Sequence, residues 1–171
     1  MNETELIKLI TQKLAQRQTS QVTLSCQENF TEKKAPETTL FFDNQQVVLE
    51  QVPVSLIHDL FYFKKDNPWV AWILTGLSYQ VTFSFKINHQ TLLFVPWKML
   101  TAWPIMLEID NRKVIALTTA IIKREEILTL FESSILVKTS KQKLTDEASF
   151  QVQKRGIGIV ERIDETCIWG E

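Results

Sequence analysis

Glycine is scarce in this chain, with four among 171 residues. The four are Gly76, Gly156, Gly158 and Gly170. Neither a P-loop nor a GxGxxG dinucleotide-binding turn can be written with this spacing. Gly156 and Gly158 do form a GxG pair, but they lie between an expected helix and an expected strand, where a helix C-cap and a turn explain them. The sequence therefore predicts no glycine-rich loop for phosphate.

Cysteine pairs, long apolar runs and an excess of one charge are also missing. Cys26 and Cys167 lie far apart and form no CxxC or Cys/His spacing, which is typical of ordinary thiols in a reducing compartment. Lysine plus arginine number 19 and aspartate plus glutamate 20, so no basic surface for nucleic acid or anionic lipid is expected. The N-terminus has no apolar signal core, and the strongest apolar run, 69–74, is too short to cross a bilayer. These features indicate a cytoplasmic chain with neither nucleic acid nor membrane as a partner.

Patterns typical of catalysis or metal binding are absent as well. Ser133–Ser134 and Thr118–Thr119 have no His with a carboxylate nearby in sequence, although a triad can assemble from distant segments. Glu125–Glu126 and Asp164–Glu165 stand among other charges, as solvated carboxylates do. His58 has no convincing ligand spacing, which favours a structural role over metal binding. We therefore expect no catalytic residue, no cofactor and no metal site.

The most regular pattern in the chain is a strand over 79–87. Its apolar and polar residues alternate without a break, which predicts one buried and one polar face. The apolar residues are Tyr79, Val81, Phe83, Phe85 and Ile87. Upstream, Asn67 and Pro68 predict the start of a helix whose Trp69 and Trp72 pack on this strand. This helix and strand should form the centre of the core.

The remaining patterns predict an α/β fold with mixed α and β elements. Further strands or extended segments are expected at 22–26, 40–42, 47–49, 91–95, 105–109, 114–117, 135–138 and 157–160. Further helices are expected at 3–17, 55–63, 97–100, 123–131 and 145–154. Asp110, Asn111 and Arg112 predict a turn that joins an antiparallel pair. We expect one compact domain, 21–171, with a mixed sheet flanked by helices, preceded by an amphipathic helix and connector over 1–20.

The expected N-terminal helix carries an apolar stripe. Asn2 and Glu5 have the spacing of a capping box, although Thr4 is an alternative cap. The residues expected to bind a partner are Leu6, Ile7, Ile10 and Leu14. The plain alternative is a terminal helix that packs on its own domain, but the polar, glycine-free connector over 16–21 favours docking elsewhere. An isolated helix this short is marginal in water, so some surface must cover its stripe.

Two tryptophans are candidate surface aromatic contacts. Trp97 and Trp103 flank a short segment bounded by Pro96 and Pro104. Partial exposure would let them contribute to binding, because aromatic residues are enriched at protein interfaces. Trp69 and Trp72, by contrast, are expected in the core.

Three parts of the chain resemble the PduM family of propanediol-utilisation microcompartment proteins. The first is Met1 to Thr4 running into the stripe of the N-terminal helix, which also resembles the short targeting helices of enzymes packed inside bacterial microcompartments. The second comprises Val81 to Phe85, Leu92–Leu93, Pro96, Lys98, Leu100, Pro104 and the strand ending at Asp110. The third comprises Ile135 to Lys138 and Lys143 to Ala148.

The resemblance implies a structural protein needed for microcompartment assembly, with no catalytic residues to carry over. Its implied partners are shell proteins, encapsulated diol-metabolism enzymes, or both, and its implied location is the bacterial microcompartment in the cytoplasm. Two alternatives stay open at this point. An α/β body can also host a small-molecule or cofactor-binding enzyme site built from distant residues, and an enzyme-reactivating adaptor is a further alternative.

Overall fold

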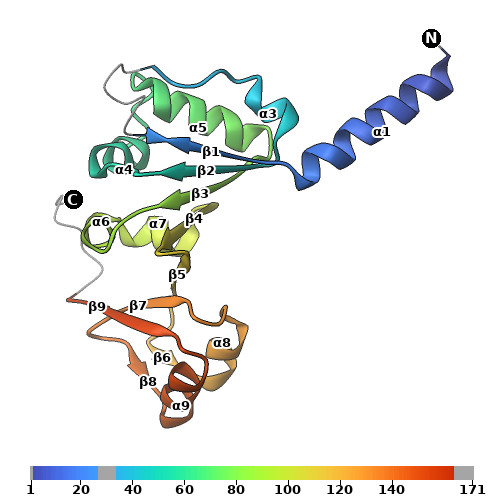
Figure 1. Cartoon of the computed structure of the whole chain (residues 1–171). Helices are drawn as coiled ribbons and strands as arrows, with labels where there is room; N and C mark the ends of the chain where they lie inside the picture. The colour runs from blue at the N-terminus through green and yellow to red at the C-terminus, as the bar shows by residue number, and fades with distance from the viewer. Residues whose placement is uncertain (1, 27–33, 164–171) are drawn as a thin grey trace. The chain divides into compact units, whose positions relative to one another are not determined.

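The computed structural model describes residues 2–26 and 34–163 of the chain. They group into two compact units, which divide between Phe85 and Lys86. Each unit contains both helices and strands, so the predicted mixed α/β class is confirmed (Figure 1). The expected boundary at residue 20 stays a prediction.

The first unit is built on three parallel strands. Its elements are α1 (Glu3–Thr19), β1 (Gln21–Ser25), α3 (Leu40–Asp43), β2 (Gln46–Glu50), α4 (Val54–Phe61), α5 (Pro68–Ser78) and β3 (Thr82–Lys86). β1 pairs with β2, and β2 pairs with β3. Parallel neighbours cannot be joined by a tight hairpin, so each connection crosses over through helical segments.

Packing of α5 on β3 forms the centre of this unit, as predicted. Asn67 caps α5 by accepting a hydrogen bond from the Trp69 backbone N–H at 3.0 Å. The Trp72 and Phe83 ring centroids lie 5.7 Å apart. A Cβ on Gly76 would lie 2.5 Å from Cζ of Phe83, so the close approach of helix and strand requires glycine there. Phe83 is consequently excluded from solvent.

Two expectations for this unit are wrong in detail. Leu40–Phe42 was expected as a strand, but it belongs to the helix α3. β1 and β2 are parallel, so the chain between them must cross over, and a three-residue apolar run does not distinguish a helical turn from a strand. Tyr79 was expected in the buried face of β3, but it is the C-cap of α5 and is exposed. The strand itself begins only at Thr82, once the helix has ended.

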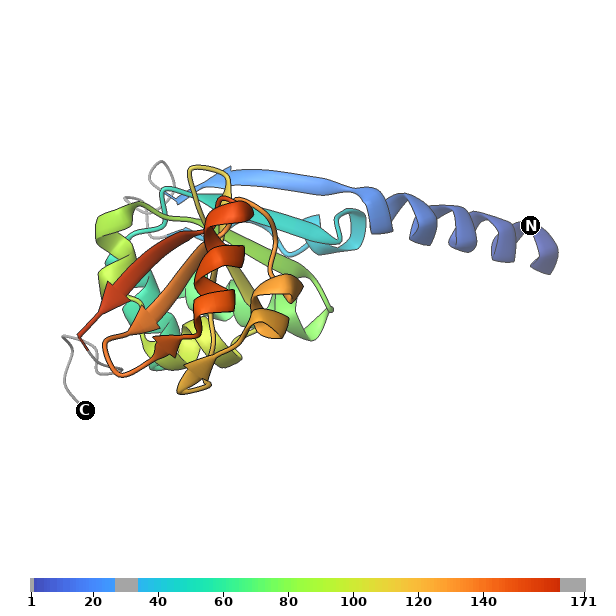
Figure 2. The same ribbon diagram turned by 90° about the horizontal axis from the view of Figure 1, so that it is seen from below.

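The second unit contains a mixed sheet. Its elements are α6 (His89–Phe94), α7 (Trp97–Ala102), β4 (Ile105–Ile109), β5 (Arg112–Ala116), β6 (Ile121–Ile122), α8 (Arg124–Thr129), β7 (Ile135–Thr139), β8 (Lys143–Leu144), α9 (Asp146–Lys154) and β9 (Gly158–Arg162). β4 pairs antiparallel with β5, whereas β5, β7 and β9 run parallel. The orange and red arrows of β7 and β9 point the same way in Figure 2. β6 and β8 form a separate parallel pair.

The core beside α8 and α9 is a single apolar cluster. Its buried members are Ile122, Ile127, Leu130, Leu136, Ala148, Val152 and Ile157. Thr145 caps α9 by accepting a hydrogen bond from the Ala148 backbone N–H at 3.2 Å. The Arg112 guanidinium donates to the carbonyls of Ser133, Ser134 and Gly156, and so ties β5 to the ends of the neighbouring segments.

The predicted hairpin of this unit is confirmed, but one extended segment is wrong. Asp110 and Asn111 both have positive φ, 50° and 61°, as a two-residue primed turn requires. Residues 91–95 were expected to be extended, yet 91–94 belong to α6. Asn88, expected in a turn, accepts a hydrogen bond from the Thr91 backbone N–H at 2.7 Å and thereby starts this helix. The apolar pattern of residues 91–95 fits either a helix or a strand, and the N-cap at Asn88 favours the helix.

Replacing Phe83 by alanine should lower the free energy of unfolding of the first unit by about 3–5 kcal/mol, because a large buried ring is lost between α5 and β3. Chemical denaturation followed by tryptophan fluorescence measures the change. Phe150→Ala on α9 is the matched control, since the same substitution at an exposed ring should change stability by about 0.5 kcal/mol or less. Equal effects of the two variants would contradict the core assignment.

Candidate functional site

The apolar stripe of α1 lies in solvent. Among the described residues of α1 none is buried. The four predicted contact residues Leu6, Ile7, Ile10 and Leu14 are between 42% and 58% exposed. Leu9, on the edge of this stripe, is exposed as well. Large aliphatic side chains gathered on one helix and left in water are typical of a surface that a partner covers.

The helix begins at the predicted cap. Asn2 precedes α1, and its backbone N–H donates to the Glu5 carboxylate at 3.2 Å. This bond satisfies one of the donors that a helix N-terminus leaves open, and the negative charge of Glu5 is favourable there. The capping interaction stabilises the first turn without contact with the sheet.

The C-terminal end of α1 is fixed to the first unit by two charged side chains. Arg17 donates from Nε to the Phe41 carbonyl at 2.9 Å and from a terminal nitrogen to the Tyr79 carbonyl at 2.8 Å. Lys13 lies 2.9 Å from the Asp43 carboxylate, in an exposed ion pair. The last turns of α1 therefore have a defined direction, while the turns before them carry the exposed stripe.

Two exposed aromatic rings lie at this attachment, and the sequence reasoning missed them as surface residues. Phe42 on α3 and Tyr79 have ring centroids 5.6 Å apart in an edge-to-face arrangement. Phe42 is 57% and Tyr79 45% exposed. Their contact joins segments that are distant in sequence. The pair could have been predicted only if α3 had been recognised as a helix and the end of α5 had been placed at Tyr79.

Trp97 and Trp103 were expected to be partly exposed, and for Trp97 this expectation is wrong. Trp97 is 8% exposed, because it begins α7 and packs inward. Its position after Pro96 therefore serves the core of the second unit. Trp103, at the C-cap of α7, is partly exposed, and its role as a contact stays a prediction.

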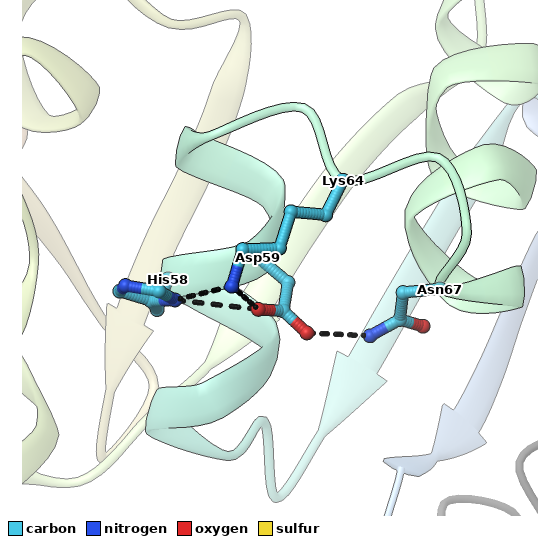
Figure 3. Close-up of polar contacts among 4 residues, drawn as sticks. All are labelled: His58, Asp59, Lys64 and Asn67. Atoms are coloured by element: carbon cyan, nitrogen blue, oxygen red, sulfur yellow. Dashed lines mark hydrogen bonds and ion pairs between the residues drawn. The ribbon is translucent and has the colours of Figure 1, made fainter.

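A second polar cluster joins α4 to α5 (Figure 3). Asp59 accepts hydrogen bonds from Lys64 Nζ and Asn67 Nδ2, each at 3.0 Å. His58 Nδ1 lies 3.3 Å from the same carboxylate. Burial by itself would raise the pKa of Asp59, but the hydrogen bonds from Asn67, Lys64 and His58 outweigh burial and hold the pKa below its ordinary value.

The geometry of this cluster is that of a structural clamp. Asn67 uses its amide nitrogen for Asp59 and its amide oxygen for the cap of α5, so one side chain connects both helices. Within the part of the chain that the structure describes, no hydroxyl or thiol takes part in the contacts of Asp59, as a nucleophile would. The predicted structural role of His58 is consistent with these contacts.

Residues 2–26 and 34–163 offer neither a metal-ligand cluster nor an activated thiol. No group of three or more His, Cys, Asp or Glu side chains in these ranges is arranged to hold a metal ion. Burial raises the pKa of the Cys26 thiol to about 12, which keeps it protonated and unreactive. Cys167 and the pair Asp164–Glu165 lie outside the described residues. In these same ranges, no helix has the length and apolar character needed to cross a membrane.

Asp59→Asn should lower the free energy of unfolding at neutral pH. It should also make this free energy depend less on pH in the acid range. A carboxylate with a lowered pKa contributes stability above its unfolded pKa, and this contribution is lost as the pH falls below about 4 through the folded value. Urea denaturation between pH 3 and pH 7 measures the difference between variant and wild type. An unchanged difference across this range would contradict a charge-dependent clamp.

Comparison with known proteins places the chain in a family. Residues 5–158 match a family model described as "Putative propanediol utilisation". No curated protein and no solved structure matches the chain. The matched range runs from the first turn of α1 to the first residue of β9. The chain therefore belongs to the PDU-like family of propanediol-utilisation proteins.

Proposed function

We propose that this protein is a non-catalytic assembly component of a propanediol-utilisation bacterial microcompartment, of the PduM type. It associates through α1 with shell proteins, with encapsulated diol-metabolism enzymes, or with both. Its place is the microcompartment in the bacterial cytoplasm. Membership of the propanediol-utilisation family supports the setting.

The observation that carries the proposal is the exposed apolar face of α1. Leu6, Ile10 and Leu14 recur at one-turn spacing and all face solvent. Covering such residues would stabilise a complex by about 1.5–3 kcal/mol for each side chain, before the losses of association. The apolar area of the stripe is removed from water only when a partner covers it.

The attachment of α1 supports the same role. Arg17 and Lys13 hold the last turns against α3 without burying the stripe. The folded unit thus presents the helix in a defined direction, which reduces the conformational entropy lost on docking. A helix on a wholly flexible tether would lose more on binding.

The expectation of no catalytic role belongs to the proposal. It is supported by the lack of nucleophile, ligand and phosphate-loop spacings in the sequence. In the structure, the polar cluster at Asp59 is accounted for by its contacts between α4 and α5. Trp103 is a second candidate contact, on the other unit.

Ile10→Glu combined with Leu14→Glu should weaken association with microcompartments by about 3–6 kcal/mol, because two apolar contacts are lost and charge enters the interface. Quantitative co-purification of tagged protein with intact microcompartments is the measurement. The free energy of unfolding should change by about 1 kcal/mol or less, since neither residue is buried.

The matched control carries the same two charges on the other side of α1. Gln12→Glu with Ala15→Glu adds equal charge at exposed positions off the stripe, and association should be retained. Undiminished association of the stripe variant would refute the docking role. A large loss of its thermal stability would instead show that α1 packs on its own domain.

A further inference from the structure

One face of α1 has a symmetric order of residues, which is exposed from Glu3 to Leu14 and ends at Arg17, whose side chain is partly buried and bonded to the first unit. Glu3, Leu6, Ile10, Leu14 and Arg17 follow one another at spacings of 3, 4, 4 and 3. At 100° per residue these five positions lie within an arc of about 80°, so they form one line along the helix. Ile10 is at the midpoint, an identical leucine stands on each side, and the two ends carry opposite charges.

Such a line is complementary to itself when two copies run antiparallel. A two-fold axis at Ile10 places Leu6 opposite Leu14 and Glu3 opposite Arg17 of the second copy. The apolar residues then meet apolar residues, and each acidic end meets a basic end. A parallel pair would instead bring like charges together at both ends, which is unfavourable.

We propose that α1 pairs antiparallel with α1 of a second copy of this chain, to form a two-fold symmetric dimer. The inference rests on the docking role proposed above, and names the occupant that covers the stripe in the free protein. Interhelical contact along one stripe is small compared with obligate interfaces, so the dimer should be of micromolar strength.

The attachment of α1 to the first unit fits this arrangement. In the antiparallel pair, the acidic first turn of one copy reaches the last turn of the other. Lys13 and Arg17 lie there, and the Lys13 side chain is 72% exposed. Glu3 gives the arriving turn the negative charge that faces them. The exposed rings of Phe42 and Tyr79 lie beside Arg17 and can be covered by the same turn.

Charge reversal tests the pairing in the purified full-length chain. Sedimentation equilibrium should show a wild-type monomer–dimer equilibrium in the micromolar range. Glu3→Lys should raise the dimer dissociation constant about tenfold, because both symmetry-related charge contacts become repulsive. Ile10→Glu should raise it at least about a hundredfold, since the two charges meet at the axis.

Glu5→Lys is the control for Glu3→Lys. It makes the same charge change in the same turn, but lies about 160° around the helix from Glu3. It also removes the hydrogen bond between Asn2 and Glu5. Any fraying of the helix that results would weaken the dimer, so it cannot produce the unchanged dissociation constant expected of the control. A dissociation constant within about threefold of wild type is expected.

Cysteine cross-linking tests the register. In a Cys167→Ser background, Ile10→Cys should form an intermolecular disulfide with oxidised glutathione, because only the residue at the axis faces itself. Leu6→Cys and Leu14→Cys should each stay monomeric alone and cross-link when mixed. Ala15→Cys, off the stripe, is the control. Cross-linking of Leu6→Cys with itself would show a parallel pair and overturn the proposal.

The dimer and the docking role can fail separately. A wild-type chain that stays monomeric at about 100 μM would refute the dimer, because this concentration is far above a micromolar dissociation constant. Loss of microcompartment association in the Ile10 and Leu14 variant would still support docking in that case. A dimer whose disruption leaves microcompartment association unchanged would refute docking and leave the pairing established.

Discussion

The close approach of α5 to β3 at Gly76 is the constraint on which the first unit depends. Phe83 fills the space that a side chain at Gly76 would take, and Trp72 and Phe41 pack around its ring. This packing fixes both the end of α5 and the position of α3. The carbonyls of Phe41 and Tyr79 lie on these two segments, and they are the acceptors for Arg17. The direction of the exposed helix is therefore set by the core, although the helix adds nothing to that core.

Charged side chains in this protein act mainly as connectors between elements. Arg17 links α1 to two carbonyls, Asp59 links α4 to the cap of α5, and Arg112 links three carbonyls of the second unit. The bonds from Arg17 and Arg112 satisfy backbone carbonyls near the ends of helices and strands. These hydrogen bonds position the ends of helices and strands, while the apolar clusters supply most of the stability.

The candidate site thus differs from a typical enzyme site. Its residues are aliphatic and lie on a convex helix, and the polar groups near them hold the helix in place. A surface of this kind recognises another surface through burial of apolar area and charge complementarity. The family assignment gives a link to propanediol utilisation, and the exposed stripe of α1 is the surface on which the proposed docking rests.

The sequence by itself determined the elements whose signals are local. Asn2, Asn67 and Thr145 marked helix starts, Asp110–Asn111 marked a hairpin, and the alternation in 81–87 marked the buried strand. The apolar stripe of α1 could also be predicted, because periodicity needs only neighbouring residues. Apolar runs of three to five residues, at 40–42 and 91–95, could not be resolved in this way, since helix and strand differ little over so short a length.

Tertiary structure alone decided which apolar residues stay in water. Trp97 and Leu14 are both large apolar residues, yet the first is buried and the second exposed, because burial depends on what packs against each helix. The exposed Phe42–Tyr79 pair and the two carbonyls held by Arg17 join segments far apart in the chain, so no local pattern contains them. Local sequence determines helices, strands and caps through short-range contacts, whereas exposure and attachment follow from long-range packing.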